Sequence, residues 1–420
     1  MITKDKSIVL DKQPPEATEE GTSKGSEYPE YLKPRLRLFL SIDLVGSTAL
    51  KQGKMGERQG GGTPDLDEYK RSSLWRAPIL DFYQNFQYIF ALKWKRAEEE
   101  LRLEDTNNSN LDKPEFWKAL GDELIYNQLI STSYQACWCV RAWISAAEDF
   151  REKLRGTFPA LDVKMAAWIA GFPVINSEVV LQKNTDDLLQ QVRSGITDSM
   201  AALMQQLKSY YSSDKSKAVL DYMGPSMDIG FRLCSLSTPR EMPISLELAY
   251  ILSKVRRDLT ERENRLRDQP EPGSRENHLP APALRYMGRK SLKGVLNGRP
   301  YPVFWLDVAG RDPVEAAEDA ISSREEITSD QCLKLFKAFV EEVNNPLLIW
   351  EPYLSGVHDD RVIKSNRHSV HKELLDNWLN TLKEKEDATS LQEESEDTNS
   401  AATKDLKSQY KPEDLSIKIV

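Results

Sequence analysis

The sequence predicts an α+β fold, because segments with strand periodicity alternate with segments of helical periodicity. In RLRLFLSID, residues 35–43, leucine or isoleucine occupies every second position, which is typical of a β-strand. Residues 66–103 place large apolar side chains at helical intervals and end in a charged run, which indicates a long amphipathic helix or a helical pair. Gly121-Asp122 separates two apolar runs and predicts a tight hairpin with a carboxylate at its tip.

The rest of the chain continues this alternation. In order, we expect a helix over residues 127–155, a strand over 163–169 ended by a turn at 170–171, a strand over 217–222, a helix that begins near Ser226, a hairpin over 292–306, and one or two helices over 312–345. Gly224-Pro225 would break the strand before the helix, and Ser226 is a residue type that caps helices. Asn297-Gly298 is the turn signal of the late hairpin, which would close the sheet.

Length and composition indicate a globular chain. It has 420 residues, 40% of them hydrophobic, which is enough for a sizeable core in one large domain or two smaller ones. The net charge of −9 argues against broad contact with nucleic acid or with an anionic membrane surface. No run of about 18 consecutive apolar residues occurs, so we expect a cytoplasmic protein without a membrane segment.

The two ends differ from the middle in composition. Residues 1–34 and 383–420 are polar and charged, and we expect flexible tails there, because such segments bury too little apolar surface to fold alone. Between them we expect a globular unit over residues 35–310 and a helical extension over 311–382.

Four short motifs resemble those of the class III nucleotidyl cyclases and follow that family's order. They are FLSIDLVGST (residues 39–48) and KALGDE (118–123), similar to the two metal motifs, DYMGPSMDIGFRL (221–233), similar to the stretch that binds base and phosphate, and LKG (292–294), similar to the late phosphate-lysine motif. The resemblance implies a palm domain, which is a ferredoxin-like antiparallel sheet with helices on one face. A helical insertion and the C-terminal helical extension would decorate it.

Asp43 and Asp122 are the candidate metal carboxylates. A triphosphate and an incipient 3′-alkoxide both need divalent cations, and hard Mg²⁺ or Mn²⁺ prefers carboxylate oxygens. The resemblance assigns Asp43, Leu44 and Asp122 to two such ions per site, with attack on the α-phosphorus and release of pyrophosphate. A single aspartate at a strand end or turn is more often structural, so the prediction depends on both acids and on the later motifs.

The resemblance also assigns residues to the phosphates and the ribose. Backbone amides from Leu44 onward, including those of Gly46, Ser47 and Thr48, would hold phosphate oxygens at a helix start.

Arg232 would hold the α-phosphate, and Lys293 would bind the terminal phosphates. On its own, an arginine on a helix is more often a solvated or salt-bridged surface group, and the lysine beside Gly294 is equally typical of an exposed hairpin. Asp228 departs from the family's usual asparagine, keeping an acceptor for the ribose but losing the amide donor.

Lys118 and Asp221 match the positions with which the family recognises the base. One donor and one acceptor suit adenine, cytosine and uracil alike, so pocket volume would have to distinguish them. Departures at Asp228 and Glu123, and an aromatic insertion that would narrow the pocket, favour a pyrimidine, although the same insertion also suits a core or dimerisation helix.

The chain as a whole resembles the pyrimidine cyclases of bacterial Pycsar antiphage defence. That resemblance implies conversion of UTP to cyclic UMP, with CTP second and ATP as the alternative. It also implies that a separate effector with a cyclic-nucleotide sensor detects the product.

The resembled family builds each active site from two subunits, with the metal aspartates from one and the Arg, ribose and base residues from the other. Because this chain contains both sets, we expect a two-fold homodimer with two shared sites. The rival hypothesis is a catalytically silent cyclase-like regulator, against which both metal carboxylates argue. A G-x-S-x-G match at residues 21–25 lies in a polar tail without a flanking strand and is accidental.

Overall fold

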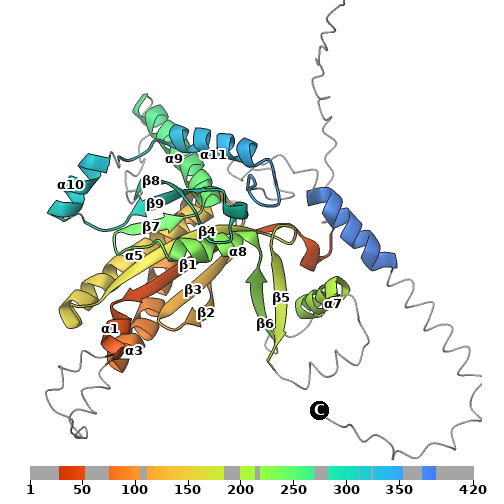
Figure 1. Ribbon diagram of the computed structural model, residues 1–420, viewed down its shortest axis with the longest axis horizontal. Helices are drawn as coiled ribbons and strands as arrows, with labels where there is room; N and C mark the ends of the chain where they lie inside the picture. Colours follow the sequence, from red (N-terminus) through yellow and green to blue (C-terminus); the bar gives the residue numbers. More distant parts are fainter. Residues whose placement is uncertain are drawn as a thin grey trace, which may run out of the picture.

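A seven-stranded, mostly antiparallel sheet forms the centre of the protein (Figure 1). The computed structural model describes residues 28–52, 75–104, 111–183, 199–212, 218–268, 282–310, 312–322, 325–352 and 371–384. The strand order is β2 (Glu115–Leu120), β3 (Glu123–Ile130), β1 (Arg35–Val45), β4 (Asp162–Phe172), β7 (Glu241–Ile244), β9 (Tyr301–Asp307), β8 (Ala283–Lys290). Only the β4–β7 pair is parallel within this sheet. The α+β class is therefore confirmed.

Strand β1 is buried on both faces and paired along both edges. It runs antiparallel to β3 on one side and to β4 on the other. Leu38 and Leu40 point into one core and Phe39 into a second core on the opposite face. This two-sided burial explains why the predicted strand is so apolar.

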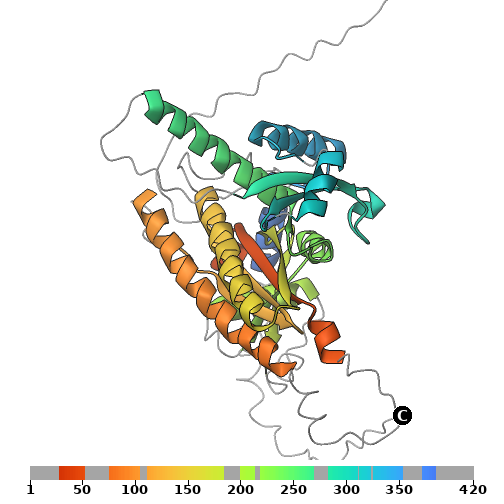
Figure 2. The ribbon, with the colours of Figure 1, turned by 90° about the vertical axis from the view of Figure 1, so that its left-hand side faces the viewer.

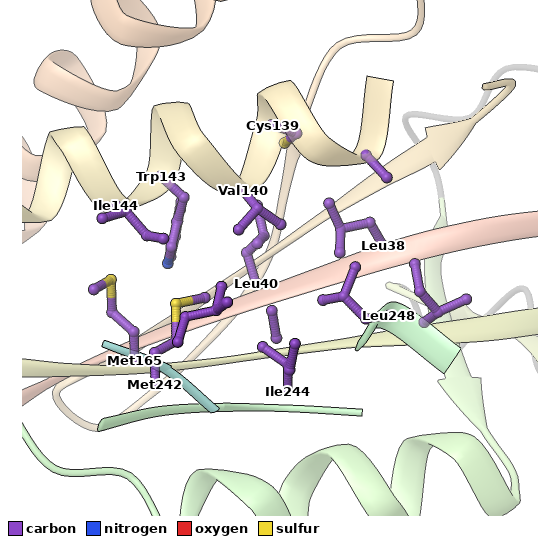
Figure 3. Packing of buried hydrophobic residues seen from close by; sticks show 14 of the residues in the cluster. Leu38, Leu40, Cys139, Val140, Trp143, Ile144, Met165, Met242, Ile244 and Leu248 are labelled. Carbon is purple, nitrogen blue, oxygen red and sulfur yellow. The ribbon is translucent and has the colours of Figure 1, made fainter. Parts of the chain in front are cut away.

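Three long helices cover one face of the sheet: α4 (Gln87–Glu104), α5 (Ser133–Thr157) and α9 (Leu246–Asp268) (Figure 2). Val140, Trp143 and Ile144 of α5 lie over Leu38 and Leu40 of β1 (Figure 3). Burial of these large side chains against the strands fixes the helical layer on the sheet.

The helical insertion predicted for residues 66–103 forms the outer part of this layer. It consists of α3 (Arg76–Asp81), a π-helical turn (Phe82–Phe86) and α4, while residues 66–74 lie outside the described part of the chain. Phe86 and Phe90 meet Trp143 of α5 edge to face, with ring centroids 4.9 and 4.7 Å apart. The aromatic residues of the insertion are core residues.

The opposite face carries α8 (Pro225–Cys234) and a two-stranded ribbon of β5 (Ser177–Gln182) and β6 (Ala218–Met223). The expected cap at Ser226 is wrong, because Gly224 occupies the N-cap position and Pro225 begins the helix. Asn176 supplies the cap instead: its Oδ1 accepts from the Ser226 N–H at 3.0 Å, and its Nδ2 donates to the Ser226 Oγ at 3.1 Å. A residue fifty positions away in sequence cannot be found from local capping rules.

Three predicted boundaries are corrected. Residues 127–130 extend β3 rather than starting a helix, since they pair with β1, and α5 begins after the Thr132 cap. Residues 170–171 continue β4, because they too pair with the long strand β1. The late hairpin joins the adjacent strands β8 and β9, but β8 ends at Lys290, so Asn297 and Gly298 lie in a 3₁₀ turn, η4 (Leu296–Gly298), inside a longer connection and do not form a tight hairpin turn.

The remaining described helices are α1 (Ser47–Gln52), α7 (Ser199–Ser212), α10 (Pro313–Ser322), α11 (Ser329–Val343) and one over residues 371–384. Within the expected N-terminal tail, the described residues include the 3₁₀ turn η1 (Glu30–Leu32), whose Leu32 is fully buried. The Tyr28 hydroxyl donates to Asp376 Oδ1 at 2.7 Å. Among the described residues, no helix combines the length and apolar character that crossing a bilayer requires.

Replacing Gly230 by alanine is expected to destabilise the protein. An added Cβ would lie 2.2 Å from the Trp168 ring, so α8 would have to move away from the sheet, at a cost of about 3 kcal/mol in the free energy of unfolding. Urea denaturation measures this change. Gly156→Ala is the matched control, because its Cβ meets nothing within 4 Å in α5, and a gain of about 0.5 kcal/mol is expected there. Equal effects at the two positions would contradict close packing of α8 on Trp168.

Candidate active site

The two candidate metal aspartates lie at adjacent positions in the sheet. Asp43 is near the end of β1 and is paired with Glu123, and Asp122 precedes Glu123 in the turn between β2 and β3. The Leu44 N–H donates to the Asp122 carbonyl at 3.3 Å. This hydrogen bond attaches the turn to β1 directly after Asp43, so two acids far apart in sequence share one corner of the sheet.

Each of these aspartates forms an ion pair with a lysine. Lys164 of β4 lies opposite Asp43 in the β1–β4 pairing, and its Nζ is 3.2 Å from Asp43 Oδ2. Lys51 of α1 places its Nζ 3.1 Å from Asp122 Oδ1. Sequence reasoning missed both lysines, because only strand register and helix placement bring them to the acids. They balance two negative charges that would otherwise repel each other.

The donor set suits a hard divalent cation bound together with a phosphate substrate. In the described part of the chain, no three His, Cys, Asp or Glu side chains group so as to hold a metal ion. Mg²⁺ is commonly held by one or two protein carboxylates plus substrate phosphates, so two aspartates fit that chemistry. A structural zinc site would need a fuller ligand set.

Glu123 is a third acidic group at this corner of the sheet, and Asp43, Asp122 and Glu123 together are called the acid corner below. It accepts a hydrogen bond from the Ser41 hydroxyl and also contacts the thiol of Cys234 in α8. Burial raises the pKa of the Glu123 carboxyl, and the charge of Asp43 adds to that rise, while the Ser41 and Cys234 contacts oppose it. Burial likewise raises the pKa of the Cys234 thiol, so this cysteine is a protonated hydrogen-bond partner and not a nucleophile.

Tyr83 supports the turn that carries Asp122, and sequence reasoning missed it. Its hydroxyl donates to the carbonyl of Gly121, which has a φ of +67° that favours glycine. Tyr83 belongs to the π-helical turn of the insertion, a kind of helix irregularity that often occurs at functional sites. The insertion therefore packs the core and also contacts the acid corner.

Lys118 and Asp221 come together as one ion pair across 103 positions of sequence, with Nζ 2.6 Å from Oδ1. A register shift in β2 between Phe116 and Lys118 is a bulge-like irregularity, which re-aims the side chains that follow it. The Lys118 ammonium lies 3.9 Å from the centroid of the Trp117 ring. One donor and one acceptor are thus fixed side by side.

Arg232 and Lys293 also come together. The Arg232 Nε donates to the Lys293 carbonyl at 3.1 Å, and Asp228 lies one turn earlier on the exposed face of α8. In the described residues, Arg232 makes no hydrogen bond or ion pair with Asp43 or Asp122. The cationic group and the acid corner are separate sets within one chain.

The segment after Asp43 is shaped by Gly46. Its φ is +89°, and a Cβ there would lie 2.9 Å from the Ala160 carbonyl oxygen, so only glycine fits. Helix α1 follows at Ser47, which is buried, whereas Thr48 is exposed. The motif resemblance predicts that the Leu44 amide binds a phosphate oxygen. In the structure this N–H instead donates to the Asp122 carbonyl.

The described part of the aromatic insertion, residues 75–104, does not narrow the base pocket. Phe82, Phe86 and Phe90 pack in the core under the long helices. Lys118 and Trp117 lie with the core on the opposite face of the sheet. The alternative interpretation of the insertion, a core helix, is the one that the packing supports.

No protein-family model matches the chain, and no curated protein matches it. Solved structures of nucleotidyl cyclases are similar to it at low sequence identity. Among the similar solved structures are the adenylyl cyclase CyaB from P. aeruginosa (13% identity, 67% of this chain and 97% of that chain, TM-score 0.35), the guanylyl cyclase Cya2 (12%, 67% and 95%, TM-score 0.33), and the guanylate cyclase domain of RhGC from Catenaria anguillulae (10%, 67% and 100%, TM-score 0.33).

Tyr83→Phe is expected to weaken cation binding at the acid corner. Losing the hydroxyl frees the Gly121 carbonyl and loosens the Asp122 turn, and comparable supporting residues around metal ligands change affinity by about tenfold or more. Mn²⁺ titration followed by electron paramagnetic resonance measures this directly. Tyr88→Phe, in α4 directly after the π-helical turn and 64% exposed, is the matched control and should bind as the wild type does. Unchanged Mn²⁺ affinity in Tyr83→Phe would contradict the supporting role.

Proposed function

We propose that the chain is a nucleotidyl cyclase of the class III type, which converts a nucleoside triphosphate into a 3′,5′-cyclic nucleotide and pyrophosphate. One observation carries the proposal: Asp43 and Asp122 lie at one corner of the sheet, joined by the Leu44–Asp122 hydrogen bond. The Lys118–Asp221 and Arg232–Lys293 pairs support it, because each unites two motifs that are distant in sequence.

In this proposal the two aspartates bind the metal ions and the two nearby lysines contact the phosphates. Asp43 and Asp122 would hold two Mn²⁺ or Mg²⁺ ions, which lower the pKa of the ribose 3′-hydroxyl and neutralise phosphate charge when bound. Lys51 and Lys164 would give up their carboxylate partners and remain nearby as cations for the phosphate oxygens.

Arg232 would bind the α-phosphate, where negative charge grows during in-line attack, and Lys293 would bind the terminal phosphates. Asp228 would accept a hydrogen bond from a ribose hydroxyl, and the Lys118–Asp221 pair would orient the base. These groups stabilise charge and fix geometry, which is most of what phosphoryl chemistry requires of a protein.

The catalytic assembly in this proposal is a two-fold homodimer. Among the residues that the structure describes, Arg232 makes no hydrogen bond or ion pair with Asp43 or Asp122, and Asp228 and Arg232 are exposed. An isologous interface would bring each set against the other set of the partner, giving two complete sites.

For the base we propose UTP first, CTP second and ATP as the alternative. The departures at Asp228 and Glu123 support a pyrimidine, whereas the packing of the insertion no longer does. The product would act as a second messenger in antiphage defence through a separate cyclic-nucleotide-binding effector, a role that rests on the motif resemblance.

A catalytically silent nucleotide-binding regulator is the second candidate, and the two lysines favour it. Lys51 and Lys164 already form ion pairs with Asp122 and Asp43. The charges of these two aspartates are therefore balanced without divalent cations. Such a protein would bind nucleotide through Lys118 and Asp221 but would not turn it over.

The product assay separates these functions. Purified protein is incubated with Mn²⁺ and each of ATP, GTP, CTP and UTP, and products are identified by mass spectrometry. We expect cyclic UMP as the main product, and loss of activity in Asp43→Asn and Asp122→Asn because both remove a metal carboxylate.

Asp149→Asn, on the surface of α5, is the control and should remain active. Cyclic AMP alone would overturn the base assignment. Binding of a nucleotide without any cyclic product would replace the cyclase with the silent regulator.

Coexpressing Asp43→Ala and Arg232→Ala chains tests the shared sites. Each variant alone should be inactive, whereas random pairing makes half the dimers mixed, and each mixed dimer has one intact site. About a quarter of wild-type activity should therefore return. Asp43→Ala with Asp122→Ala is the matched control, since both remove residues of the same set and no intact site can form. Equal activity in the two mixtures would contradict sharing.

A further inference from the structure

A polar cavity of about 220 Å³ lies between the sheet and the ribbon, apart from the candidate active-site groups. Arg37 of β1, Asn127 of β3 and Trp117 of β2 form its floor on the sheet side. Tyr222 of β6 and Tyr210 of α7 stand opposite them. Engineered apolar cavities of about 150 Å³ hold one benzene ring, so this space admits a substituted ring or two fused rings.

A buried hydrogen-bond network holds the floor in place. The Arg37 Nε donates to Glu178 Oε1 at 3.2 Å, and Nη1 donates to Asn127 Oδ1 at 2.9 Å. The Tyr211 hydroxyl donates to the second Glu178 oxygen at 2.7 Å. Arg37 is 9% exposed and Glu178 3% exposed, so these groups are buried and held in place. Glu178 forms ion pairs with both Arg37, at 3.1 Å, and Arg35, at 3.7 Å, so the Arg37 guanidinium already has a carboxylate partner.

The orientation of Asn127 leaves its amide N–H groups directed away from this network. Arginine can only donate, so the Asn127 oxygen must face Arg37, and the NH₂ group is on the other side. Asn127 is 4% exposed and lines the cavity, and none of the described residues accepts a hydrogen bond from that NH₂ group. The NH₂ group therefore faces the cavity, where an acceptor on a ligand would give it a hydrogen bond.

The remaining lining adds π-faces and one acceptor at the entrance. The rings of Trp117, Tyr210 and Tyr222 border the space, and Glu115, which is exposed, contributes the only carboxylate among the lining residues. An anionic ligand would meet Glu115 and the already paired Arg37, and a hydrocarbon would leave the Asn127 amide unpaired. Neither class fits.

We propose that this cavity is a binding site for a neutral planar heterocycle of the nucleobase type. A ring carbonyl would accept from the Asn127 amide, a ring N–H would donate to Glu115, and the aromatic side chains would stack on the ring. The site is distinct from the Lys118–Asp221 pair, although Trp117 and Tyr222 are the immediate sequence neighbours of that pair. The proposal does not depend on cyclase activity.

Binding of free heterocycles to the full chain tests this site without metal ions or triphosphate. Saturation-transfer NMR is run in EDTA with uracil and hypoxanthine, which carry a carbonyl and a ring N–H, and with purine and benzoate as probes that lack this pattern. We expect uracil or hypoxanthine to bind, with a dissociation constant about five- to tenfold higher in Asn127→Leu and in Glu115→Gln. Purine and benzoate should bind more weakly than either.

Two matched variants complete the experiment. Asp112→Asn removes a nearby exposed carboxylate that does not line the cavity and should bind as the wild type does. Lys118→Ala disrupts the base-recognition pair and should also retain binding. Glu115 is exposed, so Glu115→Gln is informative even where Asn127→Leu fails to fold. Absence of binding by both heterocycles, or binding abolished by Lys118→Ala and unaffected by Glu115→Gln, would overturn the proposal.

Discussion

The register of β1 between β3 and β4 is the constraint on which the candidate site depends. Asp43 is paired with Glu123 on one side and with Lys164 on the other. Because a shift of one residue would turn each β1 side chain to the opposite face, the apolar alternation of β1 also fixes where Asp43 points. Burial of Leu38 and Leu40 under α5 thus determines the position of an acid several residues away.

The two faces of the sheet differ in composition, with apolar packing on one face and most of the candidate site groups on the other. Under α4, α5 and α9 the contacts are aromatic and aliphatic, and they supply most of the apolar burial. On the other face, α8 and the ribbon carry Arg232 and Asp221, and the side chains there include buried polar groups such as Arg37. A stable layer on one side allows polar chemistry on the other.

Charge balance at the acid corner is local. Three carboxylates, those of Asp43, Asp122 and Glu123, meet two lysines and the Ser41 hydroxyl, and each acid has a named partner. If divalent metal ions replaced the two lysine ammonium groups beside the aspartates, the charge of the acid corner would change, and no additional side chain would have to move in. Tyr83 and the Leu44 amide hold the backbone of the turn.

The sequence by itself determined the strand at residues 35–43, the hairpin at Gly121-Asp122, and the Gly-Pro break before α8, because period and turn chemistry are local properties. It also named the candidate site residues, among them Asp43, Asp122 and Arg232. It placed the start of α5, the end of β4 and the late hairpin wrongly, since pairing with β1 and the long β8–β9 connection outweigh local preference there. Only the tertiary structure decided that Lys51 and Lys164 neutralise the aspartates, that Asn176 caps α8, and that the aromatic insertion fills the core. Those contacts join residues whose proximity depends on how strands and helices pack, which no local pattern encodes.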